Sequence, residues 1–407
     1  MSICGSHIFR IEPVLLRGKN SARILEESEM HDNPLRKLQE IGQSVWLDNL
    51  SRRLLDSGEL KRLIEEDDLT GITSNPTIFQ KAISGSKDYE TSLKSLLQKG
   101  LRDEKELFLN LAVEDISRAA DILWPVYQRS GGKDGFVSIE VSPDLAYETE
   151  KTVAEAKSLF STIARKNILI KVPGTKQCLP AIEQLTAEGV NVNVTLLFSV
   201  NRYEEVAEAY LRGLEKRASQ GKPIHEVASV ASFFVSRVDA LTDKLLEARL
   251  SSASTDTARQ KIKSLLGKAA VANARLAYQK YKSIFSQKRF LRLQGANVQR
   301  ILWGSTGTKN PGFSDIKYVQ ELIGPDSINT LPEATLMAFK DHGRVQITIA
   351  DHIEEAERLF MELEAVGVDI NQVTEQLEDE GVKLFSDSFS LLLKEIAEKR
   401  DFFLSGK

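Results

Sequence analysis

Short apolar runs alternate along the chain with longer segments whose apolar residues recur three and four positions apart. The runs have the length and the β-branched or aromatic content of strands, and they lie at 44–49, 71–75, 136–141, 167–172, 192–198, 227–235, 300–306 and, more weakly, 328–332. The spacing in the intervening segments predicts amphipathic helices. Strands that alternate with helices predict βαβ units and a parallel sheet. Eight such strands favour a closed barrel over an open sheet, although periodicity alone does not decide between the two.

Three stretches are longer than a single crossover helix requires. Residues 77–130 and 238–290 are expected to be helical insertions around the barrel, and residues 343–407 are expected to form two or three further amphipathic helices. Residues 30–407 are therefore predicted to be one barrel domain with extra helices, notably at the C-terminus.

The first 29 residues differ from the rest. Arg10 and Glu12 interrupt the apolar start, so no secretory signal forms, and further glutamates argue against a transit peptide. Asp32 or Asn33 followed by Pro34 has the pattern of a helix N-cap and first helical residue. We therefore expect residues 1–29 to be a disordered leader or an upstream-extended start.

Composition narrows the class of protein. The 407 residues include 54 Lys and Arg and 58 Asp and Glu, for a net charge of −4, which disfavours nucleic acid or an anionic membrane as partner. Cys4 and Cys178 cannot build a disulfide framework and suggest a reducing compartment. The five histidines lack metal-ligand spacing, and no apolar run approaches the ~20 residues that span a bilayer. Cytoplasm and plastid stroma both fit, and the acid-rich leader favours cytoplasm.

Polar residues interrupt the predicted strands, although parallel barrel strands are usually almost wholly apolar. They are Asp48, Thr73, Asn75, Ser138, Glu140, Lys171, Asn193, Thr195, Ser232 and Ser305. Because side chains alternate faces along a strand, 73 and 75, 138 and 140, and 193 and 195 each share a face. If that face is the barrel interior, these groups converge near the C-terminal strand ends, where barrel active sites lie.

Lys171 is the most informative of these residues, because it directly follows three large apolar residues. Burial disfavours the charged form of a lysine and lowers its pKa, and a neutral amine can attack a carbonyl to form a Schiff base. A strand-end lysine that reaches solvent or pairs with a carboxylate is the alternative.

The other polar residues also have structural interpretations. Asp48 could be a helix N-cap, and Asn75, which precedes Pro76, could mark only a turn and a helix start. Glu140 could form a structural salt bridge with Lys171. Thr195 could simply cap or bond back to the main chain. Each signal is weak singly, and only their shared inward face on five strands favours a catalytic interpretation.

Several longer motifs together resemble the transaldolase family, in its longer bacterial and plastid-type branch. The matching segments are QSVWLDNLSR, GITSNPTIFQKAI, VSIEVSPDLAYET, ILIKVPGT, NVNVTLLFS, SFFVSRVD, ILWGSTGTKNP and NTLPEATLMAFKDHG, which cover the order of motifs from about residue 33 to 343. The resemblance implies an (α/β)8 TIM barrel of the class I aldolase group that needs no metal or organic cofactor. It also implies transfer of a dihydroxyacetone unit from sedoheptulose 7-phosphate or fructose 6-phosphate to glyceraldehyde 3-phosphate or erythrose 4-phosphate, in the non-oxidative pentose phosphate pathway. The expected partners are thus small sugar phosphates, and we expect a monomer or homodimer.

The resemblance also implies a role for each matching residue. Lys171 would form the Schiff base, Asp48 would take the proton from the C4 hydroxyl, and Glu140 would shuttle protons through a water held by Thr195. The residues implied to bind the dihydroxyacetone unit or to support that binding are Asn75, Asn193, Thr73 and Ser138. Ser232 would help to fix the substrate, with Arg237 as the phosphate contact.

The sequence departs from the shorter members of the family after the seventh strand. They carry a second phosphate-binding arginine in an SFR-like motif, whereas this chain reads GSTGTKNP. Ser305 matches the serine of that motif, and Lys309 is our candidate replacement for the arginine. The segment lacks the GxxxxGK[ST] spacing of a P-loop.

Phe234 bears on the type of reaction. Transaldolases tend to have Phe at this position and related fructose-6-phosphate aldolases have Tyr, so Phe234 favours transfer, although it could also be an ordinary core aromatic. A simple class I aldolase and a non-catalytic barrel that binds sugar phosphates remain the alternatives.

Overall fold

Eight parallel strands close into a barrel in chain order, with β8 hydrogen-bonded to β1. The computed structural model describes residues 33–405. The strands are β1 (Gln43–Leu47), β2 (Gly71–Thr73), β3 (Phe136–Glu140), β4 (Ile168–Pro173), β5 (Val192–Leu197), β6 (Ser229–Phe234), β7 (Gln299–Gly304) and β8 (Ser327–Leu331). All eight predicted strands are confirmed to within two residues at either end. The fold is therefore an (α/β)8 barrel.

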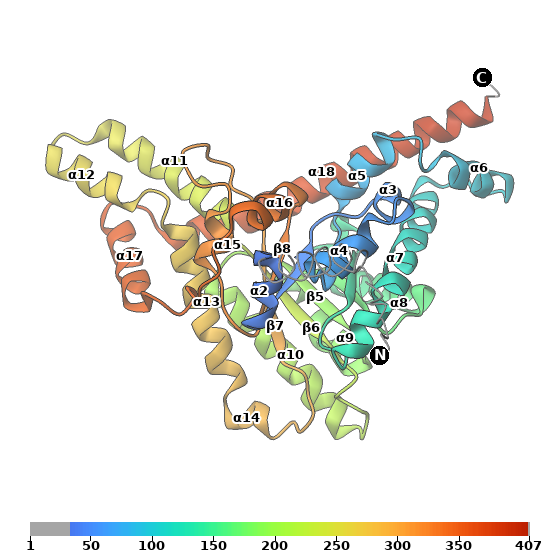
Figure 1. The fold of residues 1–407 in the computed structure, drawn as a ribbon, viewed down its shortest axis with the longest axis horizontal. Helices are drawn as coiled ribbons and strands as arrows, with labels where there is room; N and C mark the ends of the chain where they lie inside the picture. Colours follow the sequence, from blue (N-terminus) through green and yellow to red (C-terminus); the bar gives the residue numbers. More distant parts are fainter. Residues whose placement is uncertain (1–32, 406–407) are drawn as a thin grey trace, which may run out of the picture.

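Helices surround the barrel and fill the three long stretches between or after the strands (Figure 1). They are α2 (Pro34–Glu40), α3 (Arg52–Asp56), α4 (Glu59–Asp67), α5 (Pro76–Ser84), α6 (Glu90–Gln98), α7 (Glu104–Arg129), α8 (Thr149–Ile163), α9 (Leu179–Glu188), α10 (Val200–Ser219), α11 (Ser236–Ser252), α12 (Asp256–Leu265), α13 (Ala269–Phe285), α14 (Lys288–Leu291), α15 (Lys317–Glu321), α16 (Glu333–His342), α17 (Ile353–Ala365) and α18 (Ile370–Leu404). Two short 3₁₀ turns, η1 (Pro143–Leu145) and η2 (Lys176–Cys178), follow β3 and β4.

Side-chain caps fix where several helices begin. Asn33 accepts a hydrogen bond from the Leu35 N–H and Pro34 is the first residue of α2, as the sequence pattern predicts. Ser51 caps α3 in the same way by accepting from the Leu54 N–H. These caps satisfy backbone donors that would otherwise lack partners at a helix start. The expected leader at residues 1–29 lies outside the described residues.

The lower half of the barrel interior is an apolar layer. It consists of Trp46, Phe136, Leu169, Val230, Leu302 and Ile328. Trp46 lies opposite Gly71 in the strand register, and a Cβ on Gly71 would overlap the indole ring. The glycine therefore lets β2 pass beside the largest side chain of the layer, and the packed layer closes the barrel beneath the strand ends.

An ionic cluster centred on Asp134 lies at the N-terminal end of the strands. Its carboxylate accepts hydrogen bonds from Trp46 Nε1 at 2.8 Å and Ser44 Oγ at 2.6 Å, and it pairs with Arg300 at 3.2 Å. Arg300 also donates to the Ser327 carbonyl at 2.9 Å. This one carboxylate thus ties β1, β7 and β8 together at the barrel floor.

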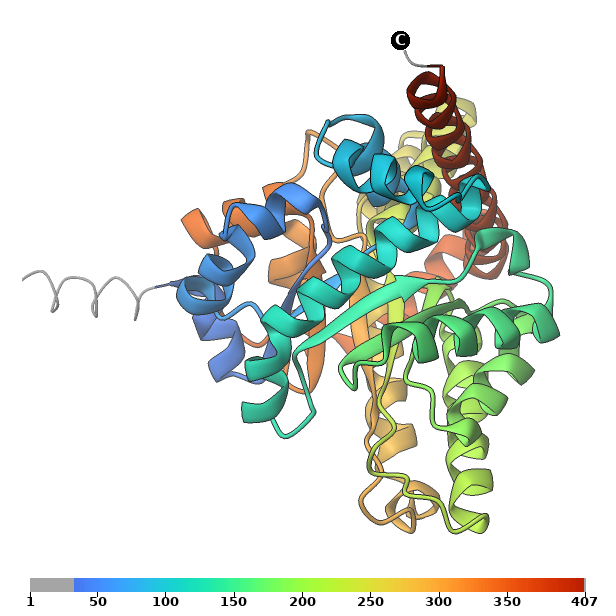
Figure 2. The same ribbon diagram turned by 90° about the vertical axis from the view of Figure 1, so that its right-hand side faces the viewer.

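The longest helix of the described chain, α18, runs past the C-terminal end of the barrel beside α5 (Figure 1). The helix α14 lies at the opposite end of the molecule from the C-terminal end of α18, and Figure 2 shows the same arrangement from the side. The stretch after residue 343 therefore contributes two helices, α17 and α18, and α18 lies over the strand ends. Within residues 33–405, every helix is too short or too polar to cross a membrane.

We predict that Asp134→Ala destabilises the barrel by about 3 kcal/mol, because it leaves the buried Trp46 N–H without its acceptor and removes the charge partner of Arg300. Chemical denaturation followed by tryptophan fluorescence measures the loss. The matched control is Asp88→Ala, at an exposed position, which should change the unfolding midpoint little. Equal midpoints for the two variants would contradict a structural role for the cluster.

Candidate active site

A cavity of about 360 Å³ opens at the C-terminal ends of the strands. Its walls come from strands β2, β4, β6, β7 and β8, from Asp48 directly after β1, from the loops after β2, β7 and β8, and from the helices α5, α11 and α18. The predicted site residues that line it are Asp48, Thr73, Asn75, Lys171, Ser232, Phe234, Arg237, Ser305 and Lys309. Residues in five strands, together with Asp48 directly after a sixth, therefore meet in one space, at the end of the barrel where the strand pattern predicted a site.

Lys171 is buried on β4, with a side chain only 5% exposed. Its Nζ donates a hydrogen bond to the Ser74 carbonyl at 3.0 Å and lies 3.3 Å from Glu140 Oε2. The predicted alternative of a lysine that reaches solvent is therefore wrong, and pairing with a carboxylate is confirmed. The amine is held at a fixed place facing the cavity.

Asp48 follows β1 and accepts a hydrogen bond from Thr73 Oγ1 at 2.7 Å. Thr73 Oγ1 also lies 2.7 Å from Thr330 Oγ1. The structure assigns the N-cap of α3 to Ser51, so the alternative role of Asp48 as a helix cap is wrong. Burial raises the pKa of Asp48 above its ordinary value, and the nearby Lys171 charge and the Thr73 hydrogen bond act in the opposite direction.

Glu140 and Thr195 carry buried oxygen atoms without hydrogen-bond partners. Within residues 33–405, both carboxylate oxygens of Glu140 and the hydroxyl of Thr195 lack one. Burial raises the pKa of Glu140, and its ion pair with Lys171 opposes that rise. A buried polar group of this kind usually has a partner, and an ordered water supplies one where the protein does not.

Asn193 lies at the centre of a buried hydrogen-bond network inside the barrel, which also contains Ser138 and Ser232. Its Nδ2 donates to Ser138 Oγ at 3.0 Å, and its Oδ1 accepts from Ser232 Oγ at 2.7 Å. All three side chains are almost fully buried. The network fixes the orientation of the Asn193 amide and joins β3, β5 and β6. Ser138 and Asn193 lie inside the barrel and are not part of the cavity wall.

Asn75 has a structural role in addition to its place on the cavity wall. Its Oδ1 accepts from the Ile78 N–H at 3.0 Å and caps α5, which confirms the helix-start interpretation of the TSNP segment. That oxygen accepts the hydrogen bond of the cap, and the Nδ2 group remains to donate to a bound molecule.

Besides Lys171, the cations that line the cavity are Lys81, Arg237 and Lys309, and the last two lie close enough for the charge of one to act on the other. In the part of the chain that the structure describes, neither Arg237 nor Lys309 forms an ion pair. Burial lowers the pKa of both groups, and the Arg237 charge lowers that of Lys309 further. Arg237 lies over the Phe234 ring, 5.7 Å from its centroid. Ser305 lies beside them in a left-handed backbone conformation, with its hydroxyl 3.0 Å from that of Ser236. Unpaired positive groups in a cavity suit an anion.

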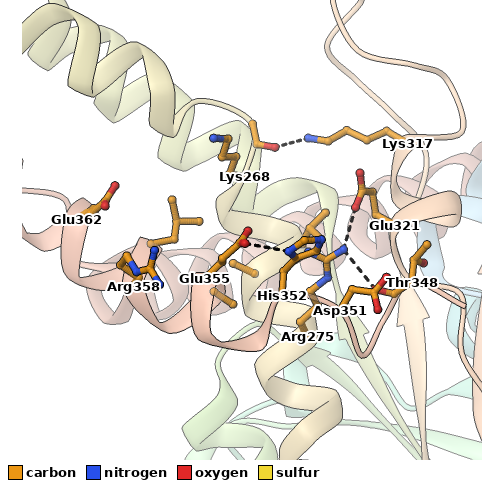
Figure 3. A pocket seen from close by; sticks show the side chains of 15 residues that line it. Lys268, Arg275, Lys317, Glu321, Thr348, Asp351, His352, Glu355, Arg358 and Glu362 are labelled. Atoms are coloured by element: carbon orange, nitrogen blue, oxygen red, sulfur yellow. Dashed lines mark hydrogen bonds and ion pairs between the residues drawn. The ribbon is translucent and has the colours of Figure 1, made fainter.

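A larger cavity, of about 560 Å³, lies between α13, α15 and α17, away from the barrel interior. Figure 3 shows two ion pairs in its wall: Arg275 pairs with Glu321 at 3.0 Å, and His352 with Glu355 at 2.9 Å. Because this cavity lies outside the barrel, away from the strand ends where the polar residues meet, we assign the chemistry to the smaller cavity.

Sequence reasoning missed several residues of the cavity wall, and Thr330 and Phe385 are the two that lie next to predicted site residues. Thr330 comes from the weakest predicted strand, where a threonine on an inward position was the available signal. Phe385 comes from the middle of α18, and its ring centroid lies 5.9 Å from Lys171 Nζ. No local pattern distinguishes Phe385 from the other apolar residues of an amphipathic helix.

The closed barrel with a buried lysine and two carboxyl groups at the C-terminal strand ends defines a class, the (α/β)8 barrel enzymes with their active site at that end. The comparisons with known proteins give the family. The model of the transaldolase/fructose-6-phosphate aldolase family matches residues 45–396, and the chain belongs to this family.

Several relatives are named transaldolases, which are transferases. The chain is 44% identical to the transaldolase of Trichodesmium erythraeum over 91% of its own length and 98% of that protein. It is 46% identical to transaldolase 2 of a Nostoc species, over 90% and 97% of the two chains. It is 49% identical to the transaldolase of a Parafrankia species, over 90% and 98%.

We predict that Asp48→Asn stabilises the protein by about 1 kcal/mol at neutral pH, because the cavity then holds one carboxylate opposite Lys171 instead of two. A carboxyl whose pKa is raised in the folded state binds protons more tightly there than when unfolded, so it lowers stability as pH rises from its ordinary range through the raised value. The gain from the substitution should therefore be full above the raised pKa of Asp48 and vanish as pH falls to about 4.

Urea denaturation of both proteins across this pH range measures the difference. Asp88→Asn, at an exposed position, is the control and should give no pH-dependent gain. A variant that is less stable than the parent at neutral pH would contradict the charge imbalance.

Proposed function

We propose that this enzyme transfers a dihydroxyacetone unit between sugar phosphates through a Schiff base on Lys171. The observation that carries the proposal is the placement of the buried Lys171 amine 3.3 Å from Glu140, in a cavity shared with Asp48. The family and the named relatives support it. The donor would be sedoheptulose 7-phosphate or fructose 6-phosphate, and the acceptor glyceraldehyde 3-phosphate or erythrose 4-phosphate, which corresponds to the non-oxidative pentose phosphate pathway.

In the first step Lys171 Nζ attacks the C2 carbonyl of the donor, and water leaves as the imine forms. Glu140 accepts and returns the protons of this step through a water bound to Thr195, and the unpartnered oxygens of both residues support that water site. Burial raises the pKa of Glu140 above that of an ordinary glutamate, which strengthens it as a base and suits a group that must both take and return protons.

Asp48 then takes the proton of the C4 hydroxyl, the C3–C4 bond breaks, and the bonding electrons move toward the imine nitrogen. The aldose phosphate leaves and an enamine of dihydroxyacetone stays on Lys171. Attack of the enamine on the aldehyde of the acceptor reverses these steps, and hydrolysis of the new imine releases the product. Thr73 keeps the Asp48 carboxylate oriented toward the cavity through its 2.7 Å hydrogen bond.

Neighbouring polar groups would hold the dihydroxyacetone unit until the acceptor arrives. Asn193, oriented by Ser138 and Ser232, and the free amide group of Asn75 are the donors and acceptors available for its hydroxyls. Phe234 lines the cavity and carries no hydroxyl that could activate water. Its place supports transfer over release of free dihydroxyacetone.

The phosphate would lie at the outer part of the cavity, bound by Arg237 and Lys309. The guanidinium offers several fixed donors to a phosphate, and the ammonium adds a second positive charge. Ser305 stands next to these groups on the loop after β7. Lys309 would thus replace the second arginine of the shorter family members.

We predict that reduction with borohydride in the presence of fructose 6-phosphate attaches the dihydroxyacetone unit to Lys171. Peptide mass spectrometry locates the adduct. Lys171→Met should lose the adduct and reduce transfer by about a thousandfold or more, because no other amine can replace the nucleophile. An adduct on a different lysine, or none on folded active protein, would refute the assignment.

We predict that Lys309→Ala raises the KM for fructose 6-phosphate about tenfold, the loss expected for one phosphate contact of ~1.4 kcal/mol. Cleavage of unphosphorylated fructose should change little, since that donor lacks the group that Lys309 binds. Lys87→Ala, at an exposed position, serves as the control. An unchanged KM for the phosphorylated donor would remove Lys309 from the site.

A further inference from the structure

The C-terminal helix α18 supplies two residues to the cavity wall, Leu384 and Phe385. They differ sharply in environment. Leu384 is 45% exposed, whereas Phe385 is 4% exposed and its ring centroid lies 5.9 Å from Lys171 Nζ. Phe385 is therefore the apolar group that α18 places next to the reactive nitrogen.

Contacts on both sides of Phe385 fix the position of α18. Before Phe385, Glu378 pairs with Arg202 at 3.2 Å. After it, Ser388 accepts a hydrogen bond from Thr77 at 2.9 Å, and Glu395 accepts from Gln80. The ring is thus held over the cavity by contacts to α5 and α10.

The helix also packs closely on the end of β5. A Cβ on Gly381 would lie 3.0 Å from Leu196 Cδ2, and the Phe198 ring is 3.5 Å away. Because Gly381 has no side chain, α18 can approach the barrel closely one turn before Phe385. This close approach places the Phe385 ring near Lys171.

An aromatic ring at this distance from a nitrogen has two physical effects. Its face attracts a cationic nitrogen, whether an ammonium or an iminium, and the attraction strengthens where water is excluded. Its apolar surface also denies water a place on that side of the nitrogen. Both effects act on the atom that holds the covalent intermediate.

We propose that Phe385 is a specificity-determining residue, which covers the Lys171 intermediate and directs the bound dihydroxyacetone unit to an aldose phosphate rather than to water. This inference rests on the proposed function. The competing step is protonation of the enamine at C3 followed by addition of water to C2, after which the C2–N bond breaks, free dihydroxyacetone leaves and the amine of Lys171 is restored. Phe385 slows the protonation at C3, which only the competing path requires, because its apolar ring denies water a place beside the enamine on Lys171.

The test compares two rates in the full-length enzyme and in two variants, Phe385→Ala and the more conservative Phe385→Leu. The first rate is transfer from fructose 6-phosphate to erythrose 4-phosphate. The second is release of free dihydroxyacetone from fructose 6-phosphate alone. The control is Leu392→Ala, a buried residue two turns further along α18 that does not line the cavity.

We predict that the ratio of release to transfer rises about tenfold in Phe385→Ala and less in Phe385→Leu. In Leu392→Ala the two rates should keep their ratio, because loosening of the helix alone affects both. Phe385→Leu keeps the assay informative if the alanine variant folds poorly.

Borohydride trapping separates the failure of this inference from the failure of the proposed function. If the parent enzyme gives the Lys171 adduct but neither folded Phe385 variant changes the ratio, the role of Phe385 is refuted and the Schiff-base function stands. If the parent enzyme gives no adduct, the proposed function itself is refuted. An equal rise of the ratio in Leu392→Ala would assign the effect to the helix and not to the ring, which also refutes the inference.

Discussion

The burial of the Lys171 amine beside Glu140, in a cavity shared with Asp48, is the constraint on which the rest of the structure depends. Three ionisable groups inside a barrel lose most of their hydration, and this loss is recovered only where partners stand at fixed distances. Thr73 supplies one such partner to Asp48, and the Ser74 carbonyl supplies one to Lys171. The imbalance of two carboxyls against one amine remains, and burial raises the pKa of both acids. A site of this kind lowers stability, so the barrel around it must be rigid elsewhere.

The regions on either side of the site have different roles. The region toward the N-terminal strand ends provides the rigidity, and the region toward the cavity mouth carries the positive charge. Below the site, the apolar layer that contains Trp46 fills the barrel, and Asp134 pairs with Arg300 at the N-terminal strand ends. Above the site, Arg237 and Lys309 bring positive charge to the outer cavity, away from the acidic interior. A sugar phosphate has the matching polarity, with its anionic group at one end and its carbonyl near the other. The separation of charge along the cavity therefore supports a single orientation of the substrate, with the carbonyl toward Lys171.

Much of this arrangement could be predicted from the sequence because strand geometry is simple. Alternation by two residues identified the inward positions, and the family motifs supplied the roles expected for Lys171, Asp48 and Glu140. The closure of the barrel required the pairing of β8 with β1, which no local pattern encodes. Asn75 shows a different limit, since one side chain both caps α5 and lines the cavity. Phe385 was out of reach, because its contact with Lys171 depends on how a long helix far along the chain packs against α5 and β5.

The chemistry proposed for this site needs one water and must exclude others. Imine formation and hydrolysis require a water that can exchange protons with Glu140. Glu140 and Thr195 lie on the strands to either side of β4, and their buried oxygens without hydrogen-bond partners support a place for that water. Phe234 and Phe385 place rings in the same cavity from β6 and α18. An apolar wall that excludes water beside the nitrogen lengthens the life of the covalent intermediate. A single polar site that holds one water lets the imine form and hydrolyse. An enzyme that transfers the dihydroxyacetone unit rather than releasing it needs both features. In this fold the barrel strands supply the polar site, and α18 completes the apolar wall.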